Sequence, residues 1–115
     1  MRRGPFGIAR PKEGLTEVTL EGGGVIWSTD EREGAVAVLV YPWDVALARE
    51  APVDSALNHL QAPITSLVRV GNRVRVRVGS LTAEVTAASA ERLGLATGEP
   101  VVASFKATAT RLLPA

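Results

Sequence analysis

A strict alternation of valine and arginine in the second half of the chain is the feature that most limits the fold. From residue 68 to residue 78 valines occupy even positions and arginines odd positions, interrupted only around Gly71 and Asn72, which mark a turn or bulge. Side chains of a β-strand point to opposite faces in turn, whereas an α-helix repeats about every 3.6 residues. The pattern therefore predicts half-buried strands with one apolar face and one cationic face.

Shorter alternating or apolar runs predict further strands along the chain. Gly22–Gly24 supply a hairpin turn between the first two of them, and Gly79-Ser80 supply a turn before the fifth. Strands are expected at 16–20, 25–27, 35–40, 45–49, 81–85 and 101–112. Residues 51–63 contain prolines and turn-forming residues, and we expect a linker with a short strand or turn there.

One short helix is expected between these strands. Thr86 is a suitable N-cap for a helix over residues 87–93, and Gly94 stands where a left-handed C-terminal residue is expected. About seven short strands, one helix and frequent glycine turns predict an all-β fold, most simply an OB-like Greek-key barrel.

The 115 residues suit one small domain. Residues 1–14 carry glycine, proline and charge without a period and are expected to be a flexible leader. The single domain is expected over 15–115, with an N-terminal strand segment at 15–50 and a core at 51–115. The longest apolar run, residues 35–41, is too short to span a bilayer, and no apolar stretch of a secretory signal develops, so we expect a cytoplasmic protein without membrane insertion.

The chain has no cysteine and a single histidine, His59. This composition excludes disulfides, thiolate metal sites, cysteine nucleophiles and multi-histidine metal sites. No phosphate-binding GxxxxGK[ST] motif occurs, so ATP hydrolysis by this chain alone is not expected. We therefore expect a binding protein rather than an enzyme, with no cofactor or metal, and we expect His59 in a loop or at the surface.

The last expected strand has one face made only of hydrogen-bond donors. Ser104, Lys106, Thr108 and Thr110 share this face, and alternate residues of a strand stand about 6.5 Å apart. Lys106 and Thr108 can therefore converge on a small oxyanion. The alternative is a solvated lysine that only protects a sheet edge.

Two further groups of side chains have alternative interpretations. The arginine stripe at residues 73, 75 and 77 fits a nucleic-acid-binding OB domain, but it lacks aromatic stacking partners, and surface pairing with Glu84 is favoured. Trp27, Tyr41 and Trp43 are expected to be core or interface anchors.

Three stretches resemble the transport-associated OB (TOBE) domain of the molybdopterin-like (Mop), molybdate-binding type. They are Asp54 to Leu60, Val85 to Leu95 and Ser104 to Ala109. The resemblance covers about residues 51–113, and residues 15–50 resemble the strand segment that precedes this region in molybdate ABC transporter ATPases. It implies the same OB-like barrel that the strand pattern predicts.

The resemblance also implies a site for molybdate or tungstate at a subunit interface. Its first segment is matched by Ser55 and Asn58, with donors from the backbone near Ala56 and Leu57, and its second by Lys106, Ala107 and Thr108. Thr82 falls near a serine-bearing stretch implied in the same site. Leu57 stands where arginine is common in the family, and Ala109 where serine is common.

The resemblance implies a homodimeric oxyanion-binding domain that acts as the regulatory or sensing domain associated with a molybdate ABC transporter. Its partners would be molybdate or tungstate and the ATPase or permease components, without nucleic acid. The alternative is a dimerisation or regulatory domain of another ABC transporter ATPase that binds no ligand. Leu57 favours this alternative, because it offers no guanidinium to an oxyanion.

Overall fold

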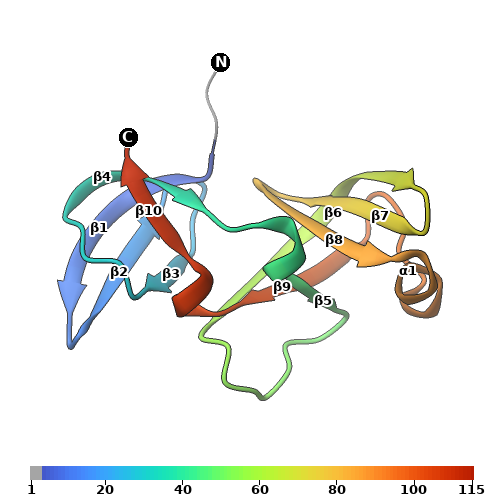
Figure 1. The fold of residues 1–115 in the computed structure, drawn as a ribbon, viewed down its shortest axis with the longest axis horizontal. Coiled ribbons are helices and arrows are strands. Elements are labelled where there is room, and N and C mark those ends of the chain that lie inside the picture. The colour runs from blue at the N-terminus through green and yellow to red at the C-terminus, as the bar shows by residue number, and fades with distance from the viewer. Residues whose placement is uncertain (1–3) are drawn as a thin grey trace.

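The computed structural model describes residues 4–115 as ten antiparallel strands in two curled sheets (Figure 1). The first sheet has the order β10-β4-β1-β2-β3, and its strands are β1 (Phe6–Lys12), β2 (Leu15–Leu20), β3 (Val25–Ser28), β4 (Gly34–Leu39) and β10 (Arg111–Pro114). The second has the order β5-β9-β6-β7-β8, and its strands are β5 (Ala46–Ala48), β6 (Asn58–Val70), β7 (Arg73–Val78), β8 (Leu81–Thr86) and β9 (Pro100–Phe105). With one short helix, the architecture confirms the expected all-β, OB-like fold.

Each sheet takes one strand from the other half of the chain. The C-terminal strand β10 pairs with β4 of the first sheet, whereas β5, which follows β4 in sequence, pairs with β9 of the second. Figure 1 shows this as the red end of the ribbon lying among the blue strands. Each sheet therefore combines strands from both sides of residue 50.

The expected leader at 1–14 is wrong over most of its length. Residues 6–12 form β1, which pairs with both β2 and β4, while residues 1–3 lie outside the described part of the chain. Gly7 allows this packing, because a Cβ at that position would stand 2.5 Å from the Thr19 carbonyl oxygen and 2.7 Å from Val18 Cγ1. The buried face of β1 consists of small residues such as Gly7 and Ala9. The sequence therefore does not show the alternation of large apolar and polar residues that predicts a strand.

The expected helix is confirmed at both ends. Helix α1 (Ala87–Leu93) begins after Thr86, whose side chain accepts a hydrogen bond from Ser89 N at 3.1 Å. It ends at Gly94, which has φ 62° and ψ 42° in the left-handed region. No helix among residues 4–115 is long and apolar enough to cross a membrane.

The expected linker at 51–63 is shorter than predicted, because β6 already begins at Asn58. Residues 58–63 of β6 pair with β9, and the strand then changes partner and pairs with β7 from Ile64. Pro63 lies at this change of partner, opposite Pro100. A proline is compatible with a strand where the ladder ends, so the residue that suggested a linker instead marks the change of pairing.

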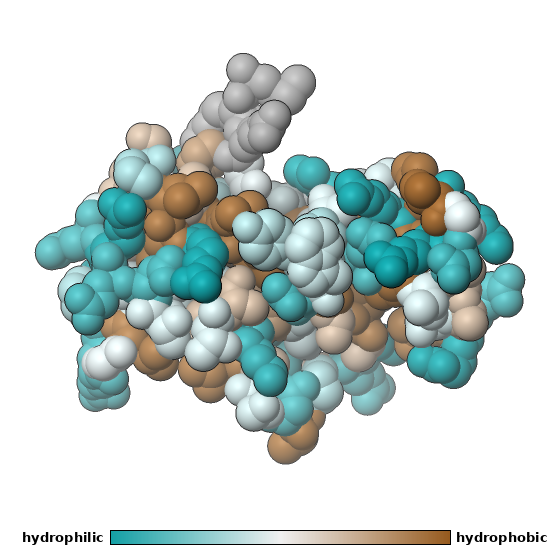
Figure 2. Space-filling model, viewed as in Figure 1, coloured by the Kyte–Doolittle hydropathy of each residue, from teal (hydrophilic) through white to brown (hydrophobic). Residues whose placement is uncertain are grey.

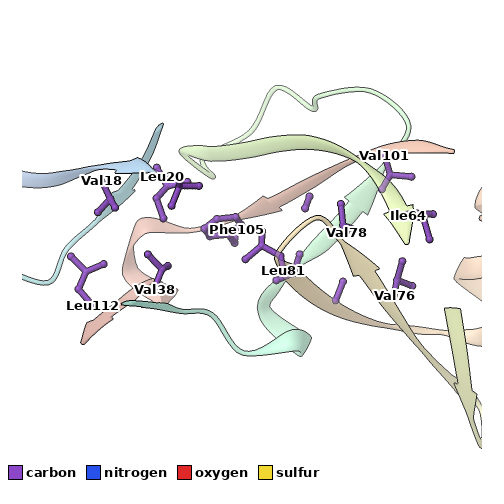
Figure 3. Close-up of a cluster of buried hydrophobic side chains, with 14 of the residues drawn as sticks. Val18, Leu20, Val38, Ile64, Val76, Val78, Leu81, Val101, Phe105 and Leu112 are labelled. Atoms are coloured by element: carbon purple, nitrogen blue, oxygen red, sulfur yellow. The ribbon is translucent and has the colours of Figure 1, made fainter. Parts of the chain in front are cut away.

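Hydrophobic side chains from both sheets form one core (Figure 3). Val18 and Leu112 come from the first sheet, and Val76 and Val101 come from the second. Phe105, which is 2% exposed, lies between the two groups in Figure 3. The core therefore joins the sheets, and Phe105 is its central contact.

The outer face of the first sheet carries an apolar surface. Ile8 of β1, Leu39 of β4 and Leu113 of β10 are 58%, 38% and 46% exposed, and these strands are neighbours in the sheet. Figure 2 shows brown, hydrophobic atoms at the surface of this lobe. Exposed apolar side chains gathered on one face are typical of a surface that contacts another protein.

Glu17 is a buried carboxylate that makes the stability of the first sheet depend on pH. Its carboxylate accepts from Arg10 Nε at 3.0 Å and lies 3.4 Å from Lys12 Nζ. Burial opposes ionisation, but the hydrogen bonds and charges of Arg10 and Lys12 outweigh it, so the pKa of Glu17 lies below its ordinary value of 4.5. Its stabilising contribution is therefore complete above that value and is lost as the pH falls through the lowered pKa.

We expect Glu17→Gln to be less stable than the wild type at pH 7, and the difference to shrink steadily between pH 5 and pH 3. Urea unfolding of both proteins across this range measures the change. Glu33→Gln at an exposed loop position is the control and should follow the wild-type profile at each pH. A stability difference for Glu17→Gln that is the same at pH 7 and pH 3 would contradict the assignment.

Candidate functional site

The two segments matched to an oxyanion site lie side by side in one chain. Residues 54–57 form the end of the loop between β5 and β6, seen in green at the bottom of Figure 1. Asn58 is paired in register with Phe105 of β9, and the second segment follows directly at Lys106. The strand pairing of β6 and β9 therefore brings segment 54–58 next to segment 106–108.

Asn58 ties these segments together through its side chain, which is 0% exposed. Its Oδ1 accepts from Trp27 N at 2.7 Å, and its Nδ2 donates to the Trp27 carbonyl at 2.9 Å and to Thr110 Oγ1 at 3.3 Å. Thr110 Oγ1 in turn donates to the Lys106 carbonyl at 2.8 Å. Both Nδ2 protons are used, so the Asn58 side chain positions the segments instead of presenting a free donor to a ligand.

Residues 106–110 do not continue the last strand, which corrects the expected strand over 101–112. β9 ends at Phe105, residues Ala107–Ala109 form a 3-10 turn, and β10 begins at Arg111. The turn is held to β3, because Thr29 N donates to the Ala107 carbonyl at 3.2 Å and Ser28 Oγ donates to the Thr110 carbonyl at 2.6 Å. The expected strand face of donors is therefore replaced by an anchored turn.

The side chains of the two segments differ in what they offer to solvent. Ser55, Lys106 and Thr108 are exposed, and Ala107 is buried. Among residues 4–115, no carboxylate lies within ion-pair distance of Lys106 Nζ. This junction thus presents one cation and two hydroxyl groups at the surface, which suits an anion.

Thr82 is not brought into this group. It lies on β8, where its partner in the pairing with β7 is Arg77. Neither strand pairing nor a side-chain hydrogen bond found within residues 4–115 connects Thr82 with the two segments. Its place in the site is therefore unsupported by the geometry.

Sequence reasoning misplaced His59, which is a neighbour of the first segment. His59 was expected in a loop or at the surface, but it is a half-buried residue of β6, paired in register with Ser104 of β9. His59 Nδ1 lies 2.7 Å from Ser104 Oγ, and His59 Nε2 lies 3.6 Å from Asp54 Oδ1. Asp54 also accepts from Ala56 N at 2.9 Å. The signal was the strand alternation of β6, which extends back into the segment taken as a linker.

The aromatic anchors lie partly outside the core. Tyr41 and Trp43 stack on each other with ring centroids 5.0 Å apart, and they are 46% and 62% exposed. Tyr41 and Trp43 therefore do not fill the core, and a place at an interface stays a prediction for them. Trp27 is half-buried, with Lys12 Nζ 5.9 Å from the ring centroid.

The arginine stripe has acidic partners, as the favoured interpretation expected. Arg73 and Arg75 lie 3.2 and 3.7 Å from the two carboxylate oxygens of Glu84 across the β7–β8 pair. Arg77 donates to the Gly79 carbonyl at 3.1 Å. Within residues 4–115, no group of three or more histidine, cysteine, aspartate or glutamate side chains is placed to hold a metal ion.

The sequence matches the TOBE domain family over residues 54–112. Because this range is more than half of the 115 residues, the chain belongs to the TOBE domain family. The matched range contains β6 to β9 and both segments of the candidate site.

Two similar proteins agree with this assignment. The chain is 34% identical over 84 residues to the molybdate/tungstate import ATP-binding protein WtpC of Pyrococcus abyssi (strain GE5 / Orsay), an alignment of 70% of this chain and 24% of the relative. It thus spans about a quarter of that relative's length. The structure of the cytoplasmic molybdate-binding protein ModG with molybdate bound matches 99% of this chain and 96% of its own, with a TM-score of 0.82 and 20% identity. At that identity the likeness shows the fold.

Proposed function

We propose that this TOBE domain binds molybdate or tungstate at the junction of segments 54–58 and 106–108. The observation that carries the proposal is the Asn58 hydrogen-bond network, which fixes the two segments beside each other and leaves Lys106 and Thr108 exposed. A tetrahedral oxyanion only accepts hydrogen bonds, so it needs donors around it. This junction offers the Lys106 cation, hydroxyl groups and backbone amides, and segment 106–108 contains no carboxylate. The names of WtpC and ModG support the choice of ligand.

The domain acts as a cytoplasmic, non-catalytic sensor or regulator associated with a molybdate ABC transporter. WtpC is an import ATP-binding protein, and this chain corresponds to about a quarter of it. No cofactor takes part, since the oxyanion is the ligand itself. The transporter's ATPase or permease components are the expected partners.

We further propose that the domain works as a homodimer that completes the oxyanion site. Ser55, Lys106 and Thr108 are exposed, so one chain covers the ligand from one side only. Five or six hydrogen bonds to the anion, each contributing roughly 1.5–3 kcal/mol, need donors from both sides. The apolar outer face of β1, β4 and β10 is a surface that a second copy can cover.

The alternative without a ligand is favoured by one observation. Leu57 is 53% exposed at the position where a guanidinium is common in the family, so the first segment has no side-chain cation. Binding then depends on Lys106 and on backbone donors. A dimerisation module would show the same dimer mass with and without molybdate, and no stabilisation by the anion.

Lys106→Ala tests the oxyanion site directly. We expect the wild type to be stabilised by about 2.7 kcal/mol at molybdate or tungstate concentrations 100 times the dissociation constant. Loss of one charged hydrogen bond of roughly 1.5–3 kcal/mol should weaken the variant at least about tenfold. Thermal unfolding with molybdate, tungstate, sulfate and phosphate measures both effects.

Lys12→Ala is the matched control for this experiment, because Lys12 is the chain's other lysine and lies on β1. It should keep the full stabilisation by molybdate. Light scattering on the same samples gives the oligomeric mass. No stabilisation of a dimeric wild type by molybdate or tungstate contradicts the oxyanion proposal, and full affinity in Lys106→Ala places the site elsewhere.

A further inference from the structure

The Asp54 carboxylate already contacts hydrogen-bond donors at the first segment of the proposed site. Asp54 Oδ1 accepts from Ala56 N at 2.9 Å and lies 3.6 Å from His59 Nε2. The side chains of Asp54 and His59 are 43% and 24% exposed, so both are reachable from solvent. The backbone amide of Ala56 is among the donors assigned to the oxyanion.

The two polar contacts of the His59 ring favour a proton on Nε2. An ionised carboxylate only accepts, so it suits a proton on Nε2, which faces it across 3.6 Å at ion-pair distance. With this tautomer, Nδ1 accepts from the hydroxyl of Ser104, 2.7 Å away. Because Ser104 is 4% exposed on β9, the strand pairing fixes the ring and directs Nε2–H toward segment 54–57.

We propose that the oxyanion site extends to His59 and that the Asp54 carboxylate competes with the anion for Nε2–H of His59 and for the Ala56 amide. This inference rests on the proposed oxyanion function. A dianion and a carboxylate repel each other and accept from the same donors, so the anion binds at this end of the site by displacing Asp54. His59 supplies a ring donor next to the segment in which Leu57 supplies none.

Asp54→Asn removes the competing charge while keeping an oxygen that accepts from the Ala56 amide. A unit charge about 4 Å from a dianion changes affinity by about thirtyfold even at the dielectric of water, so we expect molybdate to bind at least about tenfold more tightly. The matched control is Glu50→Gln, which removes an exposed carboxylate four residues earlier and should change the affinity by less than about twofold.

Two substitutions of His59 separate its nitrogens. Gln reaches the position of Nε2 and should keep the affinity within about threefold. Asn retains a polar atom near Ser104 but none at the position of Nε2, so His59→Asn should bind about tenfold more weakly. Calorimetric titration with molybdate measures all four variants, and the imidazole NMR signal of the only histidine should move as molybdate is added.

The outcomes distinguish this inference from the proposed function. Weaker binding by Lys106→Ala supports the oxyanion site. If Asp54→Asn and Glu50→Gln then have equal affinities, the proposed competition by Asp54 is wrong. Equal affinities of His59→Asn and the wild type likewise overturn the contact with His59. If neither the wild type nor Asp54→Asn binds molybdate, the oxyanion function and the inference built on it both fall.

Discussion

Phe105→Ala is expected to lower the free energy of unfolding by about 3–5 kcal/mol, the cost typical of a cavity left by a buried aromatic ring. Phe105 is 2% exposed at the end of β9, between the core residues of the two sheets. Loss of its ring removes contacts to both sheets at once, and neither sheet can close the gap without moving the other. The melting temperature should fall by roughly 10–20 °C.

Urea and thermal unfolding measure this change. Phe105→Leu should keep most of the stability, because exchange of one large apolar side chain for another usually costs less than about 1.5 kcal/mol. Val53→Ala is the exposed control and should lie within about 0.5 kcal/mol of the wild type. A loss for Phe105→Ala no larger than that of Val53→Ala means that the two sheets do not share a core.

Local patterns predicted those parts of the fold whose partners are close in sequence. The β2–β3 hairpin, the strands β7 and β8 with the turns before each, and the capped helix α1 all follow from alternation, glycine turns and an N-cap. Each of these elements carries its structural signal within about a dozen residues. Periodicity was therefore sufficient for them.

The errors lie where distant residues decide the structure. β1 has a small Gly7 on its buried face because the backbone of β2 lies close to it, and no local pattern reveals that neighbour. The chain turns away from the sheet after Phe105 because Thr110 bonds to Lys106 and Asn58. Pairing between distant strands is invisible to periodicity, so the strand was expected to continue.

The candidate site was also predicted only in part. Family resemblance placed Lys106, Thr108 and the 54–58 segment, and the strand pairing of β6 with β9 brings these segments together. The resemblance did not indicate that the Asn58 side chain is consumed by internal hydrogen bonds or that Asp54 lies beside His59. The first fact depends on Trp27, which lies outside the matched motifs, and the second depends on the path of the loop, which a sequence motif does not specify.

Asn58→Asp tests whether this buried amide holds the site together. The new carboxylate can accept from Trp27 N but cannot donate to the Trp27 carbonyl or to Thr110 Oγ1. A buried charge without compensation costs about 3–5 kcal/mol, so we expect a loss of stability of that order. Urea unfolding at pH 7 measures it.

The chain's other asparagine supplies the matched control. Asn72→Asp makes the same chemical change in the exposed turn between β6 and β7 and should stay within about 0.5 kcal/mol of the wild type. Thr110→Val removes one partner of Asn58 and should fall between the two. Since Asn58 joins segment 54–58 to the 106–110 turn, Asn58→Asp should also lose molybdate binding at temperatures where it is still folded. A variant as stable as Asn72→Asp, with wild-type affinity, would show that the strand pairing of β6 and β9 alone holds the two segments in place.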